Sequence, residues 1–96
     1  MGHGRVRVVL TPSGVVLRVP VLLFASYADA FASPRIEVTL DEGATVGDLL
    51  SRVRELAAGK ELPPSPLVAV NEEYARDSAV IRLGDEVALI PPVAGG

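Results

Sequence analysis

The last chemical group of this sequence is the α-carboxylate of Gly96. A strand-like segment at residues 86–90 precedes Pro91 and Pro92, and these prolines end it because they fix φ and remove two backbone donors. The chain then closes with small or apolar residues: Val93, Ala94, Gly95 and Gly96. A tail that ends in two glycines has no Cβ beside its carboxylate, so it could enter a narrow channel at little steric cost. We therefore expect residues 91–96 to form a flexible tail that presents one reactive group.

No set of side chains points to catalysis. The chain has no cysteine, which excludes disulfides, thiolate metal sites and a cysteine nucleophile. It also lacks the glycine-rich phosphate loops, the HExxH zinc motif and the GxSxG nucleophile motif. The single histidine, His3, lies in Met-Gly-His-Gly, which resembles a start or tag remnant. Glu72 and Glu73 are most simply explained as solvated turn residues. We expect no bound metal and no bound cofactor.

Composition predicts one small globular domain. Of the 96 residues, 49% are hydrophobic and 22% are charged, and an aliphatic core follows from the absence of Trp. The formal net charge of −3 argues against a nucleic-acid or anionic-membrane surface. No apolar run is long enough to span a membrane, and the N-terminus lacks the apolar segment of a signal peptide. We therefore expect a cytoplasmic protein.

The order of the predicted elements indicates an α+β fold. Residues 19–24 and 35–40 alternate as half-buried strands, and Pro20 places the first at a sheet edge or marks its start. Thr45 and Asp48 form a capping box before a helix, which ends near Gly59. The apolar stripe of this helix comprises Val46, Leu49, Leu50, Val53 and Leu56. With further strands at 67–70 and 86–90, the prediction is a β-grasp: a mixed sheet of four to five strands packed on one main helix.

Three segments are expected along the chain. Residues 1–17 are an N-terminal extension that is either a hairpin or disordered, since a lone two-stranded hairpin is marginal in water. Residues 18–90 form the β-grasp domain, and residues 91–96 form the mobile tail. Within the domain, alternation directs Leu22, Phe24 and Ile90 away from the core, and Tyr74 is a further candidate. If these side chains gather on one sheet face, they form a docking patch for a partner.

Several of these segments resemble one known family. They are Val21-Leu22-Leu23-Phe24-Ala25, the helix start TVGDLL at residues 45–50, the pair Val70-Asn71, and the ending GDEVALIPPVAGG at residues 84–96. Together they resemble the small, sulfur-carrying subunit of molybdopterin synthase, a ubiquitin-like family of the MoaD/ThiS type. The resemblance covers about residues 18–96, and residues 1–17 have no counterpart in the usual family pattern.

The resemblance implies a carrier without a catalytic side chain of its own. A ubiquitin-activating-type adenylyltransferase would use ATP to adenylate the Gly96 carboxylate, and sulfur would then replace the adenylate to give a thiocarboxylate. The tail would enter the active site of the large subunit of molybdopterin synthase, where two such carriers supply the two dithiolene sulfurs. The family's exposed apolar contacts fall on Phe24, Tyr74 and Ile90.

Three alternatives stay open at this stage. The chain could be a protein modifier that forms an isopeptide bond between Gly96 and a target lysine. It could be a sulfur carrier for another pathway, such as thiamine, cysteine or tungsten-cofactor synthesis. It could also be a plain interaction domain whose tail has no role.

Overall fold

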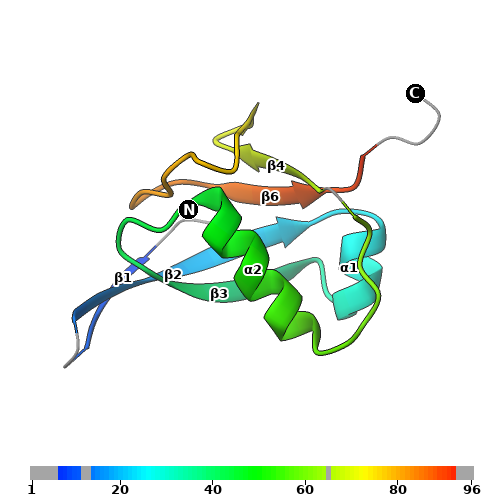
Figure 1. Ribbon diagram of the computed structural model, residues 1–96, viewed down its shortest axis with the longest axis horizontal. Coiled ribbons are helices and arrows are strands. Elements are labelled where there is room, and N and C mark those ends of the chain that lie inside the picture. Colours follow the sequence, from blue (N-terminus) through cyan, green and yellow to red (C-terminus); the bar gives the residue numbers. More distant parts are fainter. Residues whose placement is uncertain (1–6, 12–13, 65, 93–96) are drawn as a thin grey trace.

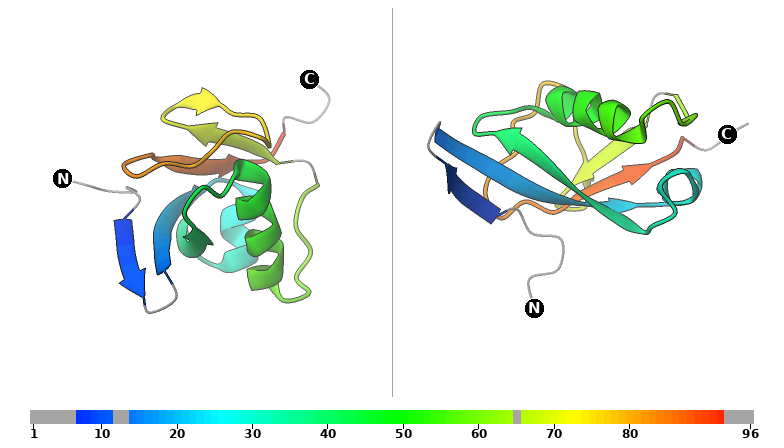
Figure 2. Two further views of the ribbon diagram at one scale, coloured as in Figure 1. Left: turned by 60° about the vertical axis from the view of Figure 1, so that its left-hand side comes forward. Right: turned by 90° about the horizontal axis from the view of Figure 1, so that it is seen from below.

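The computed structural model describes residues 7–11, 14–64 and 66–92. Its elements, in chain order, are β1 (Arg7–Thr11), β2 (Gly14–Leu23), α1 (Ser26–Phe31), β3 (Arg35–Asp41), α2 (Val46–Ala57), β4 (Leu67–Val70), β5 (Glu73–Tyr74) and β6 (Val87–Ile90). The strands form one mixed sheet, and α2 lies across one of its faces (Figures 1 and 2). This is the predicted β-grasp arrangement. The described residues form six strands, not four to five, because β1 and the two-residue β5 extend the sheet.

Strand β2 organises the sheet. It pairs along one edge with β3, and along its other edge first with antiparallel β1 and then with parallel β6. Strand β4 pairs with β6 on the far side, and β5 pairs with β4. The β6 strand that leads into the C-terminal tail is therefore held between β2 and β4, in the middle of the sheet (Figure 1).

The prediction that Pro20 marks a sheet edge or a strand start is wrong, because Pro20 lies inside β2. The Leu23 N–H donates to Pro34 O beside β3, whereas the Phe24 N–H donates to Leu89 O of β6. Backbone N–H groups point alternately to the two edges of a strand, so an N–H at residue 20 would point to the edge that β2 shares with β1 and β6. There the pairing with β1 stops at Arg18 and the pairing with β6 starts at Val21, so the missing donor falls in the gap between two neighbours.

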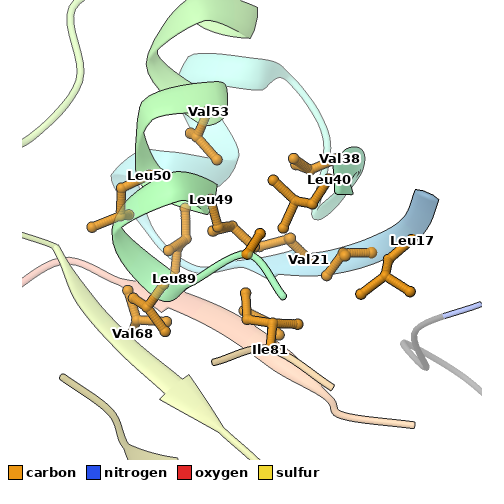
Figure 3. Packing of buried hydrophobic residues seen from close by; sticks show 14 of the residues in the cluster. Leu17, Val21, Val38, Leu40, Leu49, Leu50, Val53, Val68, Ile81 and Leu89 are labelled. Atoms are coloured by element: carbon orange, nitrogen blue, oxygen red, sulfur yellow. The ribbon is translucent and has the colours of Figure 1, made fainter. Parts of the chain in front are cut away.

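The core lies between α2 and the facing side of the sheet (Figure 3). The Thr45 side chain accepts from the Asp48 N–H, and the Asp48 carboxylate accepts from the Thr45 N–H, which confirms the capping box. The helix ends at Ala57, with Ala58 in the left-handed conformation. The predicted stripe is correct except at its last member: Leu56 is 47% exposed, and Ala57 is buried in its place.

The N-terminal segment extends the sheet. Strand β1 pairs with the first half of β2, from Arg7 opposite Arg18 to Thr11 opposite Gly14. Strand β2 then continues without a break across residues 17 and 18, where the extension was expected to end. Leu17 is buried in the same core as Val19 and Val21. Residues 1–17 were expected to be either a hairpin or disordered, and their described part is one arm and the start of the other arm of a hairpin.

The long loop between α2 and β4 is tied down by one buried aromatic residue. The Tyr27 hydroxyl of α1 donates to Pro63 O at 2.6 Å, and the Tyr27 ring is buried in the core. Burial raises the pKa of the Tyr27 phenol, and nearby Arg54 opposes this effect. The raised pKa means that the folded state holds the neutral phenol more strongly than the unfolded chain does. This stabilisation is present below about pH 10 and is lost as pH rises through the raised pKa.

Replacing Tyr27 by Phe is expected to lower the free energy of unfolding by about 1 kcal/mol, because Pro63 O loses its donor. Urea denaturation near neutral pH measures this loss. Tyr74→Phe is the matched control, since Tyr74 is 72% exposed and makes no hydrogen bond through its hydroxyl among the described residues. Equal effects of the two substitutions would contradict the anchoring role of Tyr27.

Candidate functional site

A row of side chains crosses four strands on the sheet face opposite α2. Leu22 of β2 stands beside Ala88 of β6, Ala88 beside Ala69 of β4, and Ala69 beside Tyr74 of β5. Their neighbours along each strand, such as Val21, Leu89 and Val68, are buried against α2. The strict alternation of β-strands therefore places the whole row on the outer face.

This row forms the middle of a groove with a volume of about 440 Å³, which we call the outer groove. Its lining comprises Leu22, Phe24, Ala69, Glu72, Tyr74, Glu86, Ala88 and Ile90. The two central positions of the row are alanines, whereas a leucine and a tyrosine stand at its ends. Small side chains between large ones leave the centre of the face hollow, so the groove follows directly from the order of residues across the strands.

The outer groove brings together the apolar residues predicted to face outward. Phe24 follows β2 directly and is 48% exposed, Tyr74 is 72% exposed, and Leu22 and Ile90 are half-buried. They come from three strands or their ends and line one surface. Apolar side chains gathered on one exposed face are typical of protein interfaces. Their role in binding a partner stays a prediction.

The groove lies at the base of the C-terminal tail. Strand β6 ends at Ile90, which lines the groove, and Pro91 and Pro92 follow without regular structure. The remaining predicted tail residues, Val93, Ala94, Gly95 and Gly96, lie outside the described residues. A partner that covers the groove would therefore also hold the base of the segment that ends in Gly96.

Two carboxylates also line the groove, and the sequence alone did not predict their place there. Glu72 belongs to the two-residue turn between β4 and β5, and Glu86 precedes β6. Asn71 joins the two segments: its side-chain oxygen accepts from the Glu86 N–H at 3.0 Å, and its Nδ2 donates to Asp85 at 3.0 Å. The sequence placed Glu72 in a turn and residue 86 at the start of a strand, and it did not bring them together, because their proximity depends on the pairing of β4 with β6.

The outer groove is the feature of the described residues that most resembles a binding surface. Within residues 7–11, 14–64 and 66–92, no group of three or more His, Asp or Glu side chains is placed to hold a metal ion. The same residues contain no helix that is long and apolar enough to cross a membrane. An apolar groove of this kind is suited to binding a partner, and Ile90 in its lining directly precedes Pro91 and Pro92.

The fold and the groove define a β-grasp protein of the ubiquitin-like type. Haloferax volcanii small archaeal modifier protein 1 has a similar structure, with a TM-score of 0.66 and 32% identity over 77% of this chain and 95% of that one. Residues 21–96 match the ThiS family, and this chain belongs to that family.

Several relatives that match most of this chain carry the name molybdopterin synthase sulfur carrier subunit. The Arabidopsis thaliana protein is 33% identical over 81 residues, which cover 83% of this chain and 84% of that relative. The Mycobacterium tuberculosis protein is 36% identical over 83 residues, which cover 84% of this chain and all of that relative. The family predicted from the sequence motifs is therefore confirmed.

Proposed function

We propose that this chain is the sulfur carrier subunit of a molybdopterin synthase. In this role Gly96 carries the sulfur as a terminal thiocarboxylate, and the outer groove docks the large subunit of the synthase. The carrier donates its sulfur to the molybdopterin precursor inside the large subunit and needs no catalytic side chain of its own.

The proposed cycle has three steps. The Gly96 carboxylate attacks ATP on an activating enzyme of the ubiquitin-activating type, which forms an acyl adenylate and releases pyrophosphate. A sulfur nucleophile then displaces AMP, because adenylation has turned a poor electrophile into a reactive one. Finally the tail enters the large subunit, where a bound sulfur is delivered in place and not from free solution.

The observation that supports this proposal most strongly is the family match across residues 21–96, because it includes the whole tail. Relatives that carry the sulfur-carrier name align over most of this chain. The outer groove adds an independent argument, since exposed apolar side chains surround the strand that leads into the tail.

Reconstitution of the synthase tests the proposal. The chain is prepared with a terminal thiocarboxylate, mixed with the large subunit from the same organism and with the sulfur-free precursor, and molybdopterin is measured. We expect molybdopterin in an amount limited by the thiocarboxylate supplied, and none from the plain carboxylate form. Binding of the large subunit without any sulfur transfer would contradict the proposal.

A second function has one specific observation in its favour. The chain is 32% identical to a solved small archaeal modifier protein, so the same activated Gly96 could instead be joined to a target lysine. The activation step would be shared, and only the acceptor would differ. Covalent conjugates in an extract of the native host, lost when Gly96 is deleted, would identify this second function.

A further inference from the structure

We propose that the outer groove is specific for a partner segment in which an apolar side chain is flanked by arginine or lysine, and that Glu72 and Glu86 recognise the cation. This inference rests on the proposed function, since it describes how the docking surface of the carrier chooses its partner. It adds a charge requirement to the apolar contacts proposed for this surface.

Both carboxylates line the groove, and within the described part of the chain neither forms an ion pair with an arginine or a lysine. The ion pairs between described residues join Arg18 to Glu37 and Arg52 to Glu55, and neither involves Glu72 or Glu86. The lining itself contains two glutamates and no lysine or arginine. A partner that covers the groove must therefore desolvate two negative charges, which is unfavourable unless it supplies a compensating donor.

The residues beside the two carboxylates suit a side chain that is apolar along its stem and charged at its tip. Ala69 and Ala88 provide a shallow apolar centre, and Glu86 precedes Ala88 by two residues on the same face. Arginine and lysine bury an aliphatic stem while the charged end stays near polar groups. Arginine is also enriched at the energetic centres of interfaces. An acidic partner segment would meet repulsion at the same place.

Glu72 occupies a backbone conformation that another residue would adopt more easily. Asn71 and Glu72 have φ values of 54° and 69° and connect paired Val70 and Glu73, as in a two-residue hairpin turn of type I′. Asn-Gly is the preferred pair in such turns, because the left-handed region disfavours most side chains. Glycine in place of Glu72 should therefore suit the turn better and at the same time remove one carboxylate from the groove.

The experiment measures binding of the full-length chain to the large synthase subunit from the same organism, by calorimetry and by stopped-flow association. The variants are Glu72→Gln, Glu86→Gln and the double substitution, and Glu42→Gln is the control with the same loss of charge outside the groove. Each single substitution should raise Kd about two- to fivefold, and the double substitution about tenfold. The loss should lie mainly in the association rate and should shrink at high salt. Glu72→Gly should lose affinity in the same way while its Tm rises by a few degrees.

A normal wild-type Kd together with an unchanged Kd for the double variant would overturn this inference and leave the proposed function intact. If the wild-type chain does not bind the large subunit, the proposed function fails instead. The groove is then tested by NMR titration of the labelled chain with acetyl-Leu-Arg-amide and acetyl-Leu-Glu-amide. Amide shifts around Glu72 and Glu86 with the arginine peptide alone would support the inference, and equal or absent shifts would overturn it.

Discussion

Deleting Gly96 is expected to abolish sulfur transfer and to leave the melting temperature unchanged to within about 1 °C. The reactive carboxylate would then belong to Gly95, one residue short of the position that the large subunit must reach. A misplacement of that size removes the advantage of holding the reacting groups in place. Among the described residues, the last member of the hydrophobic core is Leu89, and we expect the core to be complete without Gly96. Molybdopterin formation and thermal denaturation, measured on the same preparation, test both halves of this prediction.

The matched control is a chain that lacks residues 1–3, a comparably small terminal loss that lies before the family match. This control should keep full transfer activity. Retained activity after Gly96 deletion would show that the chain end is not the reactive group. A large loss of stability would show instead that the tail is part of the folded domain.

Replacing Phe24 or Ile90 by Arg is expected to weaken binding to the large subunit by at least about 100-fold and to leave the chain folded. Truncation of a central interface residue costs about 2 kcal/mol or more, and a bulky charged group in the groove adds a steric obstacle. Phe24 is 48% exposed and Ile90 is half-buried on the outer face, so neither substitution places an arginine in the core. Calorimetric titration gives the affinity, and circular dichroism reports the fold.

Leu83→Arg provides the control for this pair. Leu83 is an exposed apolar residue, at 64%, that does not line the outer groove. The same chemical change should there alter Kd by less than about twofold, as expected for a surface position outside an interface. An unfolded Phe24 or Ile90 variant would refute the assignment of these side chains to the outer face. Equal losses for all three would show that the added charge, and not the groove, weakens binding.

Local patterns in the sequence were enough to predict the faces of the main elements. Alternation directed Leu22, Phe24 and Ile90 away from the core, as the structure has them. The capping box fixed the start of α2 because Thr45 and Asp48 satisfy each other's backbone donors. These features depend on neighbours within a few residues, which is why a sequence reveals them.

Features that depend on distant strands were predicted less well. Pro20 was assigned to an edge or a strand start, because a sequence does not show that the partner of β2 changes from β1 to β6 at that residue. The helix stripe did not distinguish Leu56 from Ala57 at the last turn, where the sheet below determines which is covered. Likewise, Ala69, Glu72, Glu86 and Ala88 line one groove only because β6 lies between β2 and β4.

The intact mass of the untagged chain, purified from its native host, tests the central claim most directly. We predict a species that is heavier than the plain chain by the difference between a sulfur and an oxygen atom, with the change localised to Gly96 by fragmentation. That mass would establish a thiocarboxylate at Gly96, which is the form that a sulfur carrier requires. A chain found only as the plain carboxylate, together with larger covalent conjugates through Gly96, would contradict the claim and identify the chain as a protein modifier.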